Sequence, residues 1–317
     1  MTHCRNLLVG TLMLFGASTA LAAAGEWAEM APLPDERTEV SVATDGKLVY
    51  LIGGFGREEP APRTMYAYDP ATDRWQPIGE LVEGVNHAGL VVLNGRLYVV
   101  GGFRENTFSP TTGRLRIFDL ASGTWRDGAP LPTPRGALAV AVLDGRIHAI
   151  GGAIADGRSV GTHEVYDPAT DRWETRAPLP SPRNHMGAAV VDGRIYVPAG
   201  RIGRNFTLTL NEIYDPKTDS WISATPVPTG RSGIAVVAHR GKVYVFGGET
   251  FSPARRTFDE AERFDPATGS WESLPPMPTP RHGLGAAAVG EAIYVISGGP
   301  EAGFAFSGVN ERFTPAD

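Results

Sequence analysis

The residues best suited to chemistry in this chain are arginines that recur in register. Each stands sixteen residues ahead of a glycine pair or its equivalent, and they are Arg37, Arg135, Arg183, Arg231 and Arg281. A guanidinium binds a carboxylate or a phosphate through two parallel hydrogen bonds. Arg104 and Arg204, in variable segments of the chain, add two more. We therefore predict that these seven arginines bind an acidic ligand.

Three histidines offer a second chemistry. His87 and His185 each follow an asparagine in the same register, whereas His282 lies one position out of that register. Three imidazoles that converge can bind a metal ion. Because neighbouring side chains of an extended segment point in opposite directions, the shifted position of His282 argues against convergence. We therefore expect no metal and no cofactor, and we predict that His87 and His185 line a polar ligand site.

The tryptophans indicate the elements that position these residues. All six recur at intervals of 48, 50, 48, 48 and 50 residues, and they are Trp27, Trp75, Trp125, Trp173, Trp221 and Trp271. A period of that length indicates six copies of one structural unit. In each copy a turn such as Asp144-Gly145 separates two short apolar runs, which is typical of a tight β-hairpin. We expect four short antiparallel strands per copy and no helix after residue 25.

Six such units can bury their faces by packing radially, which predicts an all-β, six-bladed propeller. Trp27 begins a lone fourth strand, at about residues 26–31, and the last copy stops before its own fourth strand. The N-terminal strand should therefore complete blade six and close the ring, so that residues 25–317 form one domain. The variable connections between second and third strands then share a face with the repeated arginines, around the mouth of the central channel.

These motifs resemble the Kelch repeat. Its marks are a glycine pair after the second strand, as at Gly151-Gly152, a turn such as Tyr166-Asp167-Pro168, and a tryptophan that opens the fourth strand. The resemblance covers residues 25–317 and implies a six-bladed Kelch β-propeller. It also offers another role for the repeated arginines, which is hydrogen bonding to carbonyl groups of a neighbouring blade.

Residues 1–24 have the pattern of a secretory signal peptide, with cleavage expected near Ala22 or Ala24. An uncleaved membrane anchor is the alternative. The one cysteine, Cys4, lies in this segment, so the mature chain can form no disulfide. The formal net charge of −6 gives no basic surface for nucleic acid. We expect a bacterial periplasmic or secreted protein without a membrane span after signal removal.

Blade number and export are also similar to a bacterial Kelch-type family that interconverts the anomers of sialic acid. That family carries Gly-Glu followed shortly by Pro and Arg, and here Gly248-Glu249 precedes Pro253 and Arg255. The resemblance implies a catalytic pair, with Glu249 as a proton shuttle and Arg255 as the partner of the sugar carboxylate.

The first prediction for function is nevertheless binding. An exported Kelch propeller would present its arginine-rich loops and channel mouth to an acidic peptide, an anionic saccharide or an envelope protein. A mutarotase or epimerase of an acidic sugar is the alternative, and a non-catalytic envelope scaffold is the second alternative.

Overall fold

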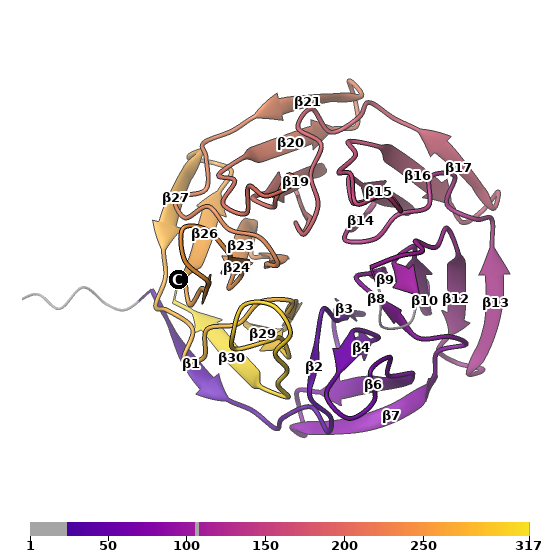
Figure 1. Ribbon diagram of the computed structural model, residues 1–317, viewed down its shortest axis with the longest axis horizontal. Coiled ribbons are helices and arrows are strands. Elements are labelled where there is room, and N and C mark those ends of the chain that lie inside the picture. Colours follow the sequence, from indigo (N-terminus) through magenta and orange to yellow (C-terminus); the bar gives the residue numbers. More distant parts are fainter. Residues whose placement is uncertain (1–23, 105–107, 317) are drawn as a thin grey trace, which may run out of the picture.

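The computed structural model describes residues 24–104 and 108–316, and every regular element in these ranges is a β-strand. The strands form six four-stranded antiparallel sheets around a central axis (Figure 1). No helix in this part of the chain is long and apolar enough to cross a membrane. The predicted signal peptide, residues 1–24, lies outside the described residues except for Ala24. The all-β six-bladed propeller is confirmed.

Each blade has four strands, ordered from the axis outward. The innermost strands are β3 (Ser41–Thr44), β9 (Gly89–Leu93), β14 (Ala139–Leu143), β18 (Ala189–Val191), β22 (Ala235–His239) and β28 (Gly285–Val289). The second strands are β4 (Val49–Ile52), β10 (Arg96–Val100), β15 (Arg146–Ile150), β19 (Arg194–Pro198), β23 (Lys242–Phe246) and β29 (Ala292–Ile296). The third strands are β6 (Thr64–Asp69), β12 (Leu115–Asp119), β16 (His163–Asp167), β20 (Asn211–Asp215), β26 (Ala261–Asp265) and β30 (Asn310–Pro315). The outermost strands are β7 (Arg74–Glu80), β13 (Thr124–Gly128), β17 (Arg172–Thr175), β21 (Ser220–Ser223), β27 (Ser270–Ser273) and β1 (Gly25–Glu29).

The N-terminal strand closes the ring, as the sequence predicts. β1 pairs antiparallel with β30, and Trp27 lies opposite Phe313. In Figure 1 the indigo β1 runs beside the yellow β30 at the rim. The first and last strands of the described chain therefore belong to one blade, so the ring cannot open without breaking that pairing.

The tryptophans join each blade to the one before it. In every blade the indole Nε1 donates a hydrogen bond of 2.8–2.9 Å to a backbone carbonyl that follows the outer strand of the preceding blade or ends it. For Trp27 the acceptor is the carbonyl of Pro275, which follows β27 of blade five. Apolar side chains of the inner strands fill the space between blades, and β4 and β29 are buried along their whole length. The near-constant tryptophan interval thus reflects one contact made six times.

Three further two-stranded pairs lie on the face that the variable connections occupy. They are β2 (Arg37–Thr38) with β5 (Phe55–Gly56), β8 (Val85–Asn86) with β11 (Phe103–Arg104), and β24 (Glu249–Thr250) with β25 (Arg256–Thr257). Each of the first two pairs joins the segment before an innermost strand to the residue after a glycine pair. Single bridges join the equivalent residues in the other four blades. These pairings fix the two chain segments that build the channel mouth.

Candidate functional site

The channel mouth is built on a ring of six equivalent residues, each two positions after the site of a repeated arginine. They are Glu39, His87, Ala137, His185, Gly233 and Gly283, and all have left-handed backbone φ angles between 51 and 67°. From the second to the sixth of them, each amide donates to the carbonyl of the equivalent residue in the preceding blade, over 2.9–3.3 Å. Val40 completes the circle by donating to Gly283. A left-handed φ costs a non-glycine residue about 1 kcal/mol or more.

A second ring comes from the residue that follows each glycine pair or its equivalent. Its members are Phe55, Phe103, Ala153, Arg201, Glu249 and Gly299. Each pairs with the residue just before the first ring, as Arg201 does with Asn184. Side chains from opposite sides of the propeller therefore meet at the axis, although they come from distant parts of the chain.

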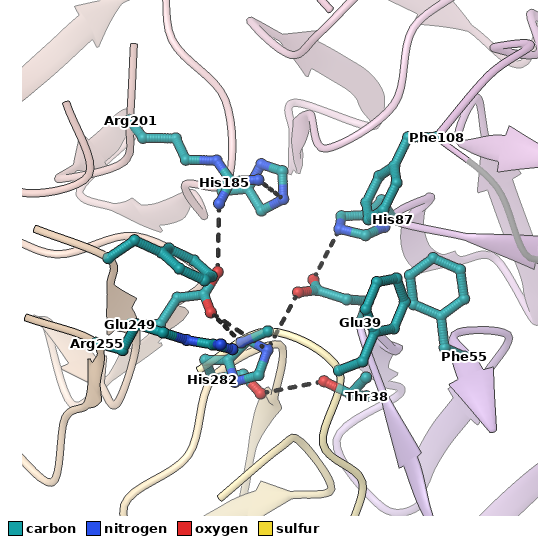
Figure 2. A pocket seen from close by; sticks show the side chains of 13 residues that line it. Thr38, Glu39, Phe55, His87, Phe108, His185, Arg201, Glu249, Arg255 and His282 are labelled. Atoms are coloured by element: carbon teal, nitrogen blue, oxygen red, sulfur yellow. Dashed lines mark hydrogen bonds and ion pairs between the residues drawn. The ribbon is translucent and has the colours of Figure 1, made fainter. Parts of the chain in front are cut away.

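The two rings and the loops around them enclose a cavity of about 280 Å³. Its lining combines four phenylalanine rings with a polar group of carboxylates, imidazoles and guanidiniums (Figure 2). The residues are Thr38, Glu39, Phe55, His87, Phe108, His185, Arg201, Glu249, Phe251, Arg255, His282, Gly303 and Phe304. Apolar walls with a few convergent polar groups are typical of a small-molecule site.

The two carboxylates occupy different electrostatic environments. Glu39 Oε2 lies 3.0 Å from His87 Nε2, and Glu39 Oε1 lies 3.8 Å from His282 Nε2. Burial acts to raise the pKa of Glu39, but the charge and hydrogen bond of His87 outweigh it and hold that pKa well below its usual range. Glu39 is therefore the ionised carboxylate of the site.

Glu249 is the more buried of the two, with 3% of its surface exposed. Its Oε2 accepts a hydrogen bond of 2.9 Å from the amide of Gly303 and lies 3.6 Å from His282 Nε2. Its Oε1 is 3.3 Å from Arg201 Nη1. Burial raises the pKa of Glu249 above its ordinary value, and the neighbouring charge of His282 opposes the rise. Two glutamates with pKa values pushed apart can divide the roles of acid and base.

The three imidazoles are oriented alike. His87 Nδ1 lies 2.6 Å from Asn86 Oδ1, and His185 Nδ1 lies 2.6 Å from Asn184 Oδ1. His282 Nδ1 lies 3.1 Å from the carbonyl oxygen of Gly299. An oxygen of this kind only accepts, so each Nδ1 carries a hydrogen, and each Nε2 faces a charged side chain of the cavity.

The shifted register does not keep His282 out of the cavity, although its ligand atom groups with Glu39 and Glu249 rather than with both His87 and His185. Gly283 occupies the ring position in blade six, and His282 lines the same cavity as His87 and His185. The equivalent residues in blades two and four are Asn86 and Asn184, which hold the neighbouring imidazoles. Alternate blades thus contribute three imidazoles from two different positions of the repeat.

The five repeated arginines do not face the channel, and the expectation that they bind a ligand there needs correction. Arg37, Arg135, Arg183, Arg231 and Arg281 are all 0% exposed. Four of them form ion pairs with buried third-strand glutamates, in the pairs Arg135–Glu164, Arg183–Glu212, Arg231–Glu262 and Arg281–Glu311. Arg37 pairs instead with Asp35, over 2.6 Å.

These arginines also bond carbonyl groups, but those of their own blade rather than of a neighbour. Arg135 Nε donates to the carbonyl of Gly151 over 2.7 Å, and its Nη2 donates to that of Ala149 over 2.8 Å. Blade two supports the structural role, because it has Val85 in place of the arginine and Arg116 in place of the glutamate. Their physical function is to satisfy the carbonyls around the glycine pair where the strand ends.

The remaining predicted residues divide between the cavity and the outer surface. His87, His185, Glu249 and Arg255 line the cavity. Arg104 instead pairs with Glu83 over 3.1 Å, and Arg204 is exposed and outside the lining. Arg201 also lines the cavity, as expected for an arginine on a variable loop of this face. Sequence reasoning missed Glu39 and the phenylalanines. A signal existed for Glu39, because it shares the register of His87.

Comparison with known proteins agrees with this architecture. The Kelch motif model matches residues 36–81, 85–132 and 134–180, and the KLHDC2/KLHL20/DRC7 Kelch-repeats domain model matches residues 174–299. Kelch-like protein 35 of Mus musculus is 32% identical over 133 residues, which is 42% of this chain and 22% of that protein. Kelch-like ECH-associated protein 1A of Danio rerio is 35% identical over 113 residues, or 34% of this chain and 18% of that protein.

The chain therefore matches about a fifth of the length of these curated relatives. A solved structure, described as the structure of YjhT, superposes with a TM-score of 0.78 at 15% sequence identity and covers 89% of this chain and 95% of the other. At that identity the likeness shows the fold alone. The repeat motifs, the two family models and the six blades agree, and the chain belongs to the Kelch-repeat family of β-propellers.

Proposed function

We propose that the channel mouth binds a small acidic ligand, of the class of anionic saccharides. The observation that carries the proposal is the composition of the cavity, in which Arg201 and Arg255 stand among phenylalanine rings. A volume of about 280 Å³ lies just below the usual range for small-molecule pockets. It suits one sugar unit better than a folded partner, which would use the broad rim of the propeller.

Arg255 is the stronger candidate for the ligand carboxylate. Its Nη2 donates to the carbonyl of Ala302, and its guanidinium carbon lies 5.4 Å from the centre of the Phe251 ring. A guanidinium carries five N–H groups, so this fixed hydrogen bond still leaves donors for an anion. Arg201 is more deeply engaged, with Glu249 and His185 as partners. Sugar hydroxyls could donate to Glu39, whose carboxylate is ionised.

Calorimetric titration with N-acetylneuraminate tests this role. Arg255→Met should weaken binding about 10-fold or more, because a hydrogen bond to a charged group contributes about 1.5–3 kcal/mol. Arg256→Met is the matched control, since Arg256 is exposed, pairs with Glu260 and lies outside the cavity lining. The methyl ester of the sugar should bind wild type as weakly as the acid binds Arg255→Met. Equal binding of acid and ester would contradict an anion site.

A second candidate function is catalytic, namely mutarotation or epimerisation of an acidic sugar. The specific observation is Glu249, a buried carboxyl with a raised pKa that lies between Arg201 and His282. Mutarotation moves the proton of the anomeric hydroxyl to a base and delivers a proton to the ring oxygen as the carbon–oxygen bond breaks. Closure on the other face of the carbonyl reverses both transfers. Burial raises the pKa of the Glu249 carboxyl, which favours its role in proton transfer.

Exchange spectroscopy by NMR on N-acetylneuraminate separates the two functions. If the protein is a mutarotase, it should accelerate exchange between anomers, and Glu249→Gln should reduce the added rate about 100-fold, as expected for loss of a general acid–base group. Glu301→Gln is the control, because Glu301 is exposed and outside the cavity lining. Binding without acceleration would leave a lectin-like module. Neither binding nor acceleration would favour a protein partner or a scaffold.

A further inference from the structure

We propose that the channel mouth holds one divalent transition-metal ion, ligated by Glu39, His87 and His185. These residues occupy three of the six positions of the first ring, in blades one, two and four. One ligand atom from each lies within 4.8 Å of the others. Two imidazole nitrogens and one carboxylate oxygen form a donor set that suits Zn²⁺ and its first-row neighbours. Metal binding by these three residues does not require the acidic ligand proposed above.

The spacing is close to that of a bound metal. Ligand atoms about 2.0–2.1 Å from a tetrahedral Zn²⁺ lie about 3.3 Å from one another. His87 Nε2 and Glu39 Oε2 are already 3.0 Å apart. The two imidazole rings are 4.8 Å apart between centroids. A small rotation of the side chains would bring the third donor into place while the left-handed backbone ring remains unchanged.

The surroundings of His87 point to a cation independently of this spacing. The ring is 7% exposed, and its Nδ1 is held by Asn86 Oδ1. Its Nε2 lies 3.0 Å from Glu39 Oε2, and this is the contact through which His87 lowers the pKa of Glu39. An imidazole lone pair and a carboxylate oxygen that face each other repel unless a proton or a metal ion lies between them. The same asparagine-to-Nδ1 contact recurs at His185, and such contacts orient metal-ligating histidines.

The equivalent positions in other blades leave space for an ion. Gly283 takes the ring position in blade six, where an added Cβ would lie 2.8 Å from Glu39 Cδ. Gly233 takes it in blade five, and Ala137 in blade three. Side chains with donor atoms thus stand at three of the six ring positions, in blades one, two and four. A vacant coordination position would face the cavity and could accept an oxygen from a ligand.

Arg201 competes with the metal ion for His185 Nε2. Its Nη2 lies 2.7 Å from His185 Nε2 and uses the lone pair that the metal requires. Its Nη1 lies 3.3 Å from Glu249 Oε1, so the guanidinium has a second partner toward which it can turn (Figure 2). Binding of the ion therefore requires Arg201 to leave His185. This competition gives the proposal a distinctive consequence, which is that loss of Arg201 strengthens metal binding.

The test is calorimetric titration of untagged, chelator-treated protein with Zn²⁺, together with visible absorption of the Co²⁺ form. We expect one equivalent with a Kd at or below about 1 µM. His87→Asn should weaken binding at least about 100-fold, and asparagine tolerates the left-handed backbone at that position. Arg201→Met should tighten binding about 10-fold and leave the Co²⁺ spectrum unchanged in shape. His239→Asn is the control, because His239 ends β22 on the opposite face.

Several results would overturn the site. One is the absence of binding by wild type at 100 µM Zn²⁺, which corresponds to a binding free energy of about −5.5 kcal/mol or weaker. Another is equal affinity of wild type and His87→Asn for Zn²⁺. The third is a loss of Zn²⁺ affinity in His239→Asn as large as that in His87→Asn. Circular dichroism and thermal unfolding establish whether each variant is folded. Glu39→Gln keeps the shape of the side chain and removes only its charge. If His87→Asn does not fold, undiminished binding by folded Glu39→Gln overturns the site just as clearly.

Discussion

Arg183→Ala is expected to lower the free energy of unfolding by about 3–5 kcal/mol, because removal of one partner leaves a buried charge uncompensated. The arginine is fully buried against Glu212, which is itself 3% exposed. Its guanidinium also donates to the carbonyls of Val197 and Ala199, over 2.6 and 2.8 Å. The alanine variant would leave these acceptors without their donors inside the blade. Reversible urea unfolding, with the slope m checked for constancy, measures the loss.

The matched control is an exposed pair in the same blade. Arg194 and Asp215 lie 3.0 Å apart, with 49% of the arginine side chain exposed. Arg194→Ala should cost less than about 1 kcal/mol, as is usual for surface pairs. If Arg183→Ala does not fold, the double variant with Arg183→Met and Glu212→Leu is expected to fold, because it removes both buried charges together. A cost for Arg183→Ala no greater than that of Arg194→Ala would refute the structural role and restore a ligand role for the repeated arginines.

Trp27→Ala should cost about 3–5 kcal/mol, the usual range for deleting a large aromatic side chain from a packed site. The indole lies 4.9 Å from the Phe313 ring and 5.7 Å from the Phe246 ring, between centroids. Its Nε1 donates to Pro275 in blade five, so one side chain ties the N-terminal strand to two blades. Loss of these contacts weakens the closure of the ring. Denaturant unfolding gives the free energy.

Two comparisons define the result for Trp27. Thr170→Ala, at an exposed turn, should change the unfolding free energy by no more than about 0.5 kcal/mol. Trp27→Phe keeps much of the packing but removes the indole hydrogen bond. Loss of that bond should lower the free energy of unfolding by about 1 kcal/mol, in addition to the loss from burying a smaller ring. Similar free energies for Trp27→Ala and Thr170→Ala would show that the ring is held without the N-terminal strand.

The fold could be predicted because each copy repeats the same local instructions. Asp144-Gly145 forms a two-residue turn between β14 and β15, and Trp173 repeats the contact that Trp27 makes. Local turn chemistry and a constant period are both properties of the sequence. Ring closure also follows from counting strands, which is why the pairing of β1 with β30 was expected.

The burial of the repeated arginines was harder to predict, although a signal was present. Three copies that carry the arginine also carry a glutamate two positions before an aromatic–aspartate pair, as in Glu164-Val165-Tyr166-Asp167. These glutamates are Glu164, Glu212 and Glu262. Arg183 and Glu212 are 29 residues apart, and only the pairing of strands brings them together. Recurrence alone could not distinguish a repeated ligand contact from a repeated internal ion pair, since both are guanidinium–carboxylate contacts.

By itself the sequence determined six units, their four strands, the closing strand and the face that carries the variable loops. Only the tertiary structure decided which polar side chains meet. Glu39, Glu249 and His282 converge within one cavity although 243 residues separate the first from the last. The physical reason is that a turn depends on neighbouring residues, whereas a site at the propeller axis depends on the left-handed ring and on loops from several blades.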